Sequence, residues 1–415
     1  MFGSETYTYF FVFLAVYFES FLLVTFLSSP ARARRAAVAA GSNGNSPKVA
    51  IVVPCWNEET TIAGTVESLL ALDYPAEKLS IILVDDGSTD RTRETLERFA
   101  THPQITAQYK ENGGKFTAMN LGIAHATDAN FIGFLDADSF VAPDALREVV
   151  AAFDSPDTAA VTASMSIHEP KTIFQRMQYA EYSFGITLRH VFASINGLYV
   201  TPGPFSFYRR SILEELGPFK HAYLTEDMEM AMRIQRAGFR IGNALRARVY
   251  TKGPPTLLRL IKQRVRWTTG FLRNLFFDYR DLIGLRHNAV LGLLILPFAV
   301  TAILGGIFLF IINAIHAVQH LAHTLSVAQT VPLSYTLSLR PLDWWYMPIT
   351  TPLLVGLTLI TSIFVWMAIG KQASGTPGRL VPSFLAYLLL YGVVAPVWLI
   401  RSVSHVALGL RTVWR

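Results

Sequence analysis

Ile81-Ile-Leu-Val-Asp-Asp-Gly-Ser88 is a short apolar run that ends in two carboxylates and a glycine. Val49-Ala-Ile-Val-Val53 precedes it, and Phe131-Ile-Gly-Phe-Leu135 follows it and leads into Asp136-Ala-Asp138. Short apolar runs bounded by turn residues indicate buried strands, and the segments between these runs have helical periodicity. Strands that alternate with helices predict a mainly parallel sheet, in which ligands bind at the carboxyl ends of the strands. The sequence therefore predicts an α/β domain whose site lies where these acids gather.

The chain outside this domain has a different composition. Of the 415 residues, 51% are hydrophobic, and residues 288–415 contain only seven charged side chains against 57 in residues 32–287. Residues 288–339, 344–370 and 380–400 contain no Asp, Glu, Lys or Arg, and residues 7–27 contain only Glu19. About 20 apolar residues cross a bilayer as a helix. We therefore expect an integral membrane protein with four spans, which excludes a purely soluble enzyme.

The distribution of basic residues predicts the orientation. No Lys or Arg precedes the first apolar stretch, whereas Arg32, Arg34 and Arg35 follow it, which places the soluble domain in the cytoplasm. The alternative is a cleaved signal peptide, but such peptides carry their positive charge before the apolar stretch. We expect a protein of the plasma (inner) membrane. Its parts would follow in this order: 1–30 a transmembrane helix, 31–47 a linker, 48–256 the cytoplasmic α/β domain, 257–287 an interfacial helix and 288–415 about three spans.

Two stretches have the pattern of helices that lie in the membrane interface. Residues 257–282 place apolar side chains at helical spacing among basic ones, and residues 171–195 mix aromatic side chains with Arg and His. The alternative is a core helix with a solvated, charged face. We assign the net charge of +6 to the membrane surface, because no basic block indicates nucleic acid. The single cysteine, Cys55, excludes disulfides and cysteine-based zinc sites.

Four motifs suggest chemistry, and each has a plainer interpretation. Asp136-Ala-Asp138 can hold a Mg²⁺ ion, although most such pairs are solvated turns. Asp85-Asp-Gly-Ser-Thr-Asp90 offers acceptors for a base or a ribose, or is an ordinary turn. Thr225-Glu-Asp227 opens a helix and can serve as its cap. Gln263-Arg-Val-Arg-Trp267 offers a guanidinium for a diphosphate and an indole for a sugar face, or anchors a helix at the interface.

In this order the motifs resemble those of the family-2 glycosyltransferases, in particular the membrane-embedded processive group of cellulose, hyaluronan, chitin-oligosaccharide and poly-N-acetylglucosamine synthases. The resemblance covers residues 49–277 and includes Ile51-Val-Val-Pro-Cys-Trp-Asn-Glu58 and Asn112-Gly-Gly-Lys115 besides the motifs above. It implies a glycosyltransferase-A-like domain joined to a helical membrane region. Trp56 stands where many relatives have Tyr, and residues 201–205 carry two prolines that match no particular synthase, so the donor sugar stays open.

The resemblance also implies roles for individual residues. Asp227 would be the general base, with Glu226 beside it, and Asp138 would hold Mg²⁺ or Mn²⁺ with the help of Asp136. The remaining roles fall into two groups: nucleotide-sugar binding by Pro54, Glu58, Asp85, Asp86, Lys115, Asp136 and Arg266, and acceptor binding by Gly203, Gln263 and Trp267.

The implied reaction is an inverting, metal-dependent transfer from a nucleotide sugar, expected to be UDP-linked, to a growing β-linked polysaccharide that leaves through the protein's own spans. The alternative is a single transfer to a lipid-linked acceptor. A transporter or a silent scaffold subunit is a third class, which the intact Asp86, Asp138 and Asp227 disfavour. Four spans are few for a closed channel, so a membrane partner subunit or a homo-oligomer is expected. Glu19 is expected either to face a polar cavity or to have no role beyond snorkelling.

Overall fold

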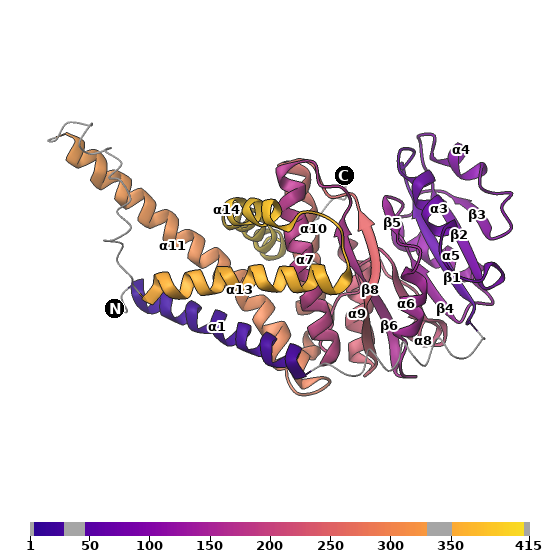
Figure 1. Cartoon of the computed structure of the whole chain (residues 1–415), viewed down its shortest axis with the longest axis horizontal. Helices are drawn as coiled ribbons and strands as arrows, with labels where there is room; N and C mark the ends of the chain where they lie inside the picture. The colour runs from indigo at the N-terminus through magenta and orange to yellow at the C-terminus, as the bar shows by residue number, and fades with distance from the viewer. Residues whose placement is uncertain (1–3, 29–45, 330–350, 411–415) are drawn as a thin grey trace.

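The computed structural model describes residues 4–28, 46–329 and 351–410, and its centre is an eight-stranded sheet (Figure 1). The strands are β1 (Val49–Cys55), β2 (Leu79–Asp86), β3 (Ile105–Lys110), β4 (Phe131–Phe134), β5 (Ser139–Val141), β6 (Thr158–Ile167), β7 (Ser206–Arg209) and β8 (Arg240–Thr251). Their order is β3-β2-β1-β4-β7-β6-β8-β5. All three runs predicted as strands, β1, β2 and β4, are neighbours in this sheet.

The sheet is mixed. β1 pairs in parallel with β2 and β4, β2 with β3, and β6 with β8. β7 runs antiparallel to β4 and β6, and β5 runs antiparallel to β8. The predicted α/β fold is therefore confirmed, and the parallel half is the part that carries the acids. β5 and β7 are three and four residues long and contain no extended apolar run, so the sequence gives little sign of them.

Helices cover both faces of the sheet because side chains alternate along each strand. Val49, Ile51 and Val53 of β1 point to the face covered by α3 (Ile62–Leu70), α6 (Ala145–Ala151) and α7 (Ile173–Ser194). Ala50 and Val52 point to the other face, which is covered by α5 (Lys115–His125), α8 (Arg210–Leu216) and α9 (Glu226–Arg236). The short helix α4 (Thr92–Glu97) follows β2. The sheet is thus buried on both sides, and only its edges are open to a ligand.

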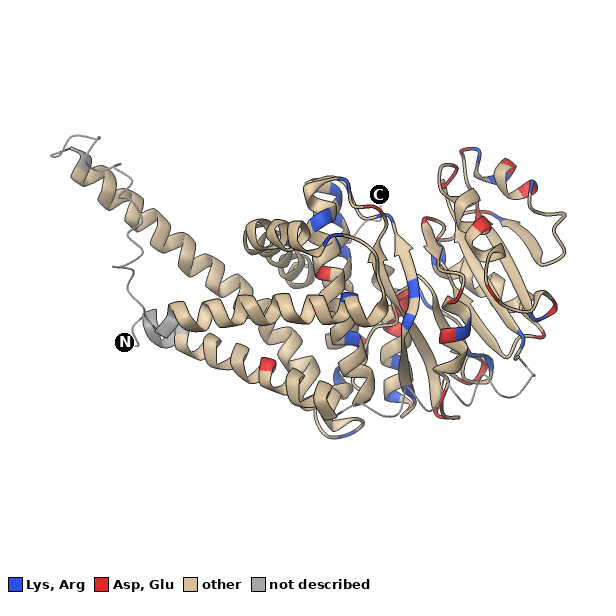
Figure 2. Ribbon diagram, viewed as in Figure 1, with Lys and Arg blue, Asp and Glu red and all other residues tan. Residues whose placement is uncertain are grey.

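Four helices among the described residues are long and apolar enough to cross a membrane. They are α1 (Ser4–Ser28), α11 (Leu296–Ala328), which continues a π-helical turn at Val290–Ile295, α13 (Thr351–Ser374) and α14 (Leu380–Ala407). Charged side chains are concentrated in the sheet domain and in the helices beside it (Figure 2). The linker predicted at 31–47 lies outside the described residues except for its last two, as does the start of the third predicted span.

Two helices, α7 and α10 (Leu257–Arg273), stand between the sheet and the four spans and run across the direction of α13 (Figure 1). α7 contacts β6 and β8 on one side and α13 and α14 on the other. α10 packs along α14. These are the two stretches predicted to lie in the membrane interface, and they connect the sheet domain to the four long apolar helices.

Glu19 joins two of the candidate spans. Its carboxylate accepts hydrogen bonds from Ser362 Oγ at 2.5 Å and Trp366 Nε1 at 2.6 Å, both on α13. A carboxylate inside a span is costly unless it is hydrogen-bonded. Glu19 therefore has partners from a neighbouring helix, which a side chain that merely snorkels to the surface would lack.

Candidate active site

The loops that follow β1 and β2 are tied together at the carboxyl ends of the strands. Asn57 NH donates to Ser88 Oγ at 3.0 Å, and Thr89 NH donates to Asn57 Oδ1 at 2.8 Å. Asn57 takes a left-handed backbone conformation, with φ at 55°, which Asn tolerates better than most residues. Pro54 lies inside β1, and Glu58 NH donates to Thr92 Oγ1 at 2.8 Å. One rigid rim therefore carries Pro54 and Glu58 beside the acids of β2.

Asp85 and Asp86 close this rim, and both are buried. Asp85 Oδ1 accepts from Ser88 NH at 3.0 Å. Asp86 Oδ1 accepts from Lys110 Nζ at 2.5 Å and from Gly113 NH, and Asp86 Oδ2 accepts from Gly114 NH at 2.9 Å. Because its oxygens are already engaged, Asp86 fixes the loop that leads to Lys115.

Lys115 begins α5 and lies at the centre of the site. Its Nζ is 2.5 Å from Asp136 Oδ1 and 3.6 Å from Glu226 Oε1. Burial by itself disfavours the charged lysine, but Asp136, Glu226 and Asp227 outweigh burial and raise the pKa of Lys115 above its usual range. A Cβ at Gly203 would stand 3.0 Å from Lys115 Nζ and 3.4 Å from both carboxylate oxygens of Asp136. Gly203 therefore gives the lysine and the aspartate room to meet.

Asp138 lies two residues beyond Asp136, where the chain enters β5. Burial, followed by repulsion from Asp136 and Glu58, raises the pKa of Asp138 to about 7. Its Oδ1 accepts from Ser139 Oγ at 3.1 Å. Carboxylates crowded in this way, with more negative charge than nearby lysine can offset, form a donor set that suits a hard divalent cation. No group of three or more His, Cys, Asp or Glu in the described ranges is arranged to hold a metal ion by itself, so such an ion would also need ligands from a substrate or water.

Asp227 is held in place at the first turn of α9. Its Oδ2 accepts from Gly203 NH at 3.1 Å, its Oδ1 accepts from Met228 NH at 2.8 Å, and its carbonyl accepts from Thr201 Oγ1. Burial and the neighbouring Glu226 raise the pKa of Asp227 to about 6, although Lys115 and Arg266 oppose this rise. A carboxylate with such a pKa is ionised near neutral pH and is basic enough to accept a proton.

A strained turn sets the direction of Glu226 and Asp227. Ala222, Tyr223 and Leu224 all take left-handed conformations, with φ between 43° and 65°, although none is a glycine. Backbone of this kind persists only where its surroundings enforce it, and it is common at functional sites. Arg266 Nη1 of α10 donates to the Leu224 carbonyl at 2.7 Å, which supports the turn. Thr225 stands at the N-cap position of α9, but its side chain makes no capping bond, so the predicted alternative of a side-chain cap is wrong. Glu226 and Asp227 do lie in the first turn of the helix.

The motif on α10 reaches the site from the membrane side. Gly270 packs directly on Thr225, and Asn274 Nδ2 donates to Thr225 Oγ1 at 2.9 Å. The Arg264 guanidinium lies 4.6 Å above the Trp267 ring, which is half-buried. Gln263 Oε1 is buried and accepts no hydrogen bond from the described residues. α10 thus supports the strained turn through Arg266, Gly270 and Asn274, and it also carries the indole and an unused amide oxygen.

The predicted residues form a connected set. Lys115, Asp136, Gly203, Glu226 and Asp227 meet through direct contacts, and Arg266 joins them through the turn. Asp138 lies close enough to Asp136 and Glu58 to be repelled by both carboxylates. It therefore stands between this group and the rim that carries Pro54, Asp85 and Asp86. Gln263 lies on α10 with Trp267.

Sequence reasoning missed Lys110 and the supports of the strained turn. Lys110 gives one signal, because as the last residue of the third strand it falls at the same sheet edge as the acids. The left-handed residues of the turn give no signal in the sequence, because none of them is a glycine.

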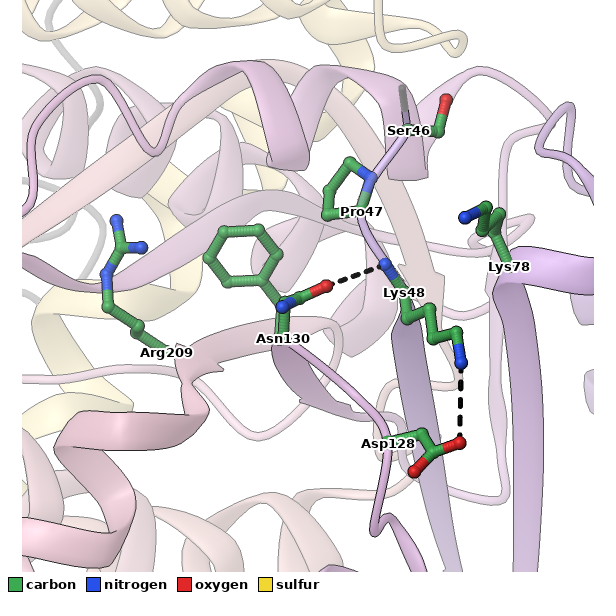
Figure 3. A pocket seen from close by; sticks show the side chains of 8 residues that line it. Ser46, Pro47, Lys48, Lys78, Asp128, Asn130 and Arg209 are labelled. Carbon is green, nitrogen blue, oxygen red and sulfur yellow. Dashed lines mark hydrogen bonds and ion pairs between the residues drawn. The ribbon is translucent and has the colours of Figure 1, made fainter. Parts of the chain in front are cut away.

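A pocket of about 530 Å³ lies at the opposite edge of the sheet, where β1, β2 and β4 begin (Figure 3). Lys48 Nζ pairs there with Asp128 at 3.3 Å, and Lys48 NH donates to Asn130 Oδ1 at 2.9 Å. Lys78 and Arg209 also line it. None of the predicted site residues lines this pocket, so we do not assign the chemistry to it.

Comparison with known proteins gives matches to the same part of the chain. The model of a family described as "Glycosyltransferase like family 2" matches residues 47–270. The chain is 30% identical over 238 residues to the beta-monoglucosyldiacylglycerol synthase of Synechocystis, covering 56% of this chain and 49% of that protein. It is 32% identical over 234 residues to the poly-beta-1,6-N-acetyl-D-glucosamine synthase of Staphylococcus aureus, covering 56% of each. The chain therefore spans about half the length of these curated relatives.

Among solved structures, the fold matches a mannosyltransferase of Pyrobaculum calidifontis in complex with GDP-Man and Mn²⁺. The TM-score is 0.56 at 18% identity, and the match covers 94% of this chain and 98% of the other. At this identity the likeness concerns the fold alone. It extends over nearly the whole chain, so the arrangement of the sheet domain with the helical region is shared and not only the sheet.

Proposed function

The chain belongs to the glycosyltransferase-like family 2, and on that premise we propose that it transfers a sugar from a nucleotide donor to a growing polysaccharide at the membrane surface, with inversion to a β-linkage. The observation that carries the proposal is the meeting of Lys115, Asp136 and Asp227 around Gly203. In this arrangement the charged Lys115 side chain is available to a leaving diphosphate, and the Asp227 carboxylate is available as a base for an incoming hydroxyl. Both lie at the same edge of a buried sheet.

The donor would lie along the rim and end at Lys115. Asp85, Glu58 and Pro54 would border the base and the ribose, and UDP is the donor nucleotide that we propose. Asp86, whose oxygens bind Lys110 and two loop amides, would act mainly by holding the loop before α5. Lys115 and Arg266 supply positive charge for the diphosphate, because oxyanions bind most strongly to charged donors.

A divalent cation, Mg²⁺ or Mn²⁺, would be held by Asp138 with Asp136 and would neutralise charge on the departing diphosphate. The raised pKa of Asp138 supports this assignment, since it reflects burial of the carboxylate together with the negative charge of Asp136 and Glu58. The related fold that was determined with Mn²⁺ and a nucleotide sugar is consistent with it.

Asp227 would take the proton from the acceptor hydroxyl. Inverting transfer needs one base on the face of the sugar opposite the leaving group, and no covalent intermediate. The amides of Gly203 and Met228 fix the two carboxylate oxygens, and burial together with Glu226 keeps the carboxylate basic. Trp267 and Gln263 would hold the acceptor sugar, with the indole as a stacking face.

The polysaccharide assignment rests on α10, which carries Gln263 and Trp267 and packs along α14. A processive enzyme needs contacts to the growing chain that persist after the nucleotide leaves, and α10 offers these beside the membrane region. We propose that the catalytic domain is cytoplasmic in the plasma membrane, and that the product leaves through the protein's own spans or through spans shared with a partner.

The test is to incubate the full-length protein, purified in a neutral detergent, with individual UDP-sugars and Mn²⁺ or Mg²⁺. The products are then analysed by mass and by linkage. We expect one UDP-sugar to give β-linked chains of many units. If no nucleotide sugar supports transfer, the proposal is wrong; a product with one added sugar would refute processivity alone.

A lipid acceptor is a second candidate, because an apolar crevice of about 760 Å³ lies between α11 and α14. Gly306 and Gly392 leave space in its walls. Tyr391 lines the crevice and also lies near Glu181 and Arg264, and Arg264 stacks on Trp267. The crevice could hold an acyl chain whose head group reaches the site. The relative from Synechocystis is named for a glucosylated diacylglycerol. Adding diacylglycerol to the assay separates the candidates: a lipid with one added sugar would favour this second function.

A further inference from the structure

Arg189, in the last third of α7, has a guanidinium edge that is buried and unused. Its Nε and Nη2 atoms have no hydrogen-bond acceptor anywhere in the described part of the chain. These two N–H groups point the same way and form the edge of the guanidinium that grips carboxylate or phosphate oxygens in pairs. The buried N–H groups of a charged side chain normally have acceptors inside the protein, so the lack of acceptors at Nε and Nη2 needs an explanation.

Among the described residues, no acid serves as a counter-ion to Arg189. Glu181, the one acid of α7, is bound by Arg264 at 2.8 Å. Tyr182 is the ionisable side chain that faces Arg189, and its phenol is neutral at ordinary pH. Burial lowers the pKa of Arg189 to about 10, which leaves it charged. An uncompensated buried cation destabilises the folded protein, so Arg189 is a costly group unless a ligand pairs with it.

The position of Arg189 connects it to the acceptor side of the site. Tyr182, Gly185 and Arg189 lie at helical spacing along one stripe of α7. The Arg264 guanidinium of α10 lies 5.8 Å from the Tyr182 ring and 4.6 Å from the Trp267 ring, so this stripe faces the acceptor motif. A Cβ at Gly185 would stand 3.2 Å from Arg189 Nη1, and its absence gives the guanidinium room to lie along the helix.

We propose that the Nε–Nη2 edge of Arg189 binds a phosphate or carboxylate group carried by the acceptor. The inference rests on the proposed transferase function and names a chemical feature of its acceptor. The diphosphate of the donor is the less suitable ligand, because Lys115 and Arg266 already surround its proposed position. Arg189 lies instead on the helix that contacts α13 and α14, where an acceptor from the membrane or a growing chain would pass.

The proposal is tested by direct binding of two matched pairs of probes to the full-length protein in neutral detergent. The first pair is undecaprenyl phosphate and undecaprenol, and the second is a trisaccharide ending in glucuronate and the same trisaccharide ending in glucose. We expect the wild type to bind the anionic member of one pair about 10- to 100-fold more tightly, the range for a charged, two-point hydrogen bond. The pair that shows the preference identifies the source of the anion.

Variants assign the preference to the guanidinium edge. Arg189→Gln should remove it, and Arg189→Lys should reduce it, because lysine offers no paired edge. Arg176→Gln is the matched control, since Arg176 is an exposed arginine of the same helix and should leave the preference unchanged. UDP affinity should be the same in all variants.

Three results would overturn the proposal: equal binding of both members in both pairs, a preference that survives Arg189→Gln, or a parallel loss of UDP affinity in that variant. A separate measurement excludes a purely structural role. Arg189→Met should raise the thermal unfolding midpoint of the ligand-free protein, because it removes an unpaired buried charge. A structural arginine would show the opposite change. Since binding is measured without turnover, these outcomes are independent of whether transfer is detected.

Discussion

Asp227→Asn is the substitution that tests the chemistry most directly. The amide keeps the size of the carboxylate and can still accept from one of the two amides, Gly203 NH and Met228 NH, that hold it. It cannot take a proton. We therefore expect turnover to fall by about 10²- to 10⁴-fold, the contribution of a positioned general base. Affinity for the nucleotide donor should change little, because the proposed role of the carboxylate is toward the acceptor and not toward the nucleotide.

The pKa of Asp227 adds a dependence on pH. With a pKa of about 6, the carboxylate is ionised above pH 7 and protonated below pH 5. Wild-type turnover should fall about tenfold per pH unit below pH 6, and the residual activity of Asp227→Asn should lack this decline. The folded-state pKa is raised from the usual 3.8, so ionisation above pH 6 destabilises the folded protein, and protonation relieves this as the pH falls. The shift corresponds to roughly 3 kcal/mol at most, and Asp227→Asn should raise the thermal unfolding midpoint at pH 8.

The assay is donor turnover by full-length protein at saturating UDP-sugar, acceptor and Mg²⁺, measured from pH 5 to pH 8. Nucleotide binding is measured separately by calorimetry. Asp128→Asn, an exposed aspartate at the opposite edge of the sheet, is the control and should behave as the wild type. If Asp227→Asn weakens nucleotide binding and keeps its turnover at saturation, Asp227 is a binding residue and the base lies elsewhere.

Three further predictions concern the metal, the acceptor and the packing of the site. A chelator should abolish transfer, Mg²⁺ or Mn²⁺ should restore it, and Asp138→Asn should not be restored; full activity in excess chelator would contradict the metal role. Trp267→Ala should shorten the polymer, as measured by size exclusion, while UDP release continues, and chains of wild-type length would exclude stacking on the indole. Gly203→Ala should lower turnover by about tenfold, because the new methyl crowds Lys115 Nζ, which is 3.0 Å away. Gly356→Ala, in open space, is its control, and equal activity of the two variants would refute the crowding argument.

The parallel half of the sheet could be predicted because hydrophobic burial leaves a direct pattern in the sequence. β1, β2 and β4 are apolar runs, and the acids that follow them fall at one edge, as expected. Helix limits were less accessible. α10 was expected to continue through residue 282, but the α-helix ends at Arg273 and a π-helical turn follows at Asn274–Asp278. The spacing of apolar residues continues from the α-helix into the π-helical turn, so hydrophobic periodicity does not reveal where the α-helix ends.

The site was predictable as a set of residues but not as a set of contacts. Asp86 was assigned to the nucleotide, yet its oxygens bind Lys110 and the amides of Gly113 and Gly114. Such bonds depend on the path of a loop, which residue types alone do not specify. The left-handed turn at residues 222–224 is formed without glycine and is enforced by tertiary contacts such as that of Arg266. In the sequence, Arg189 is only one basic residue of the aromatic stretch 171–195, because its missing partner is a property of the folded molecule.

The packing of Gly270 and Asn274 on Thr225 has a consequence for recombining this protein with its relatives. A chimera that exchanged the sheet domain at its apparent end, before Leu257, would separate Thr225 from the two residues that seat it and would leave the Leu224 carbonyl without Arg266. A viable crossover must lie beyond Asn274, so that the first membrane-side helix is inherited with the sheet. The segment that must be exchanged as one piece is therefore larger than the sheet domain, because it includes α10.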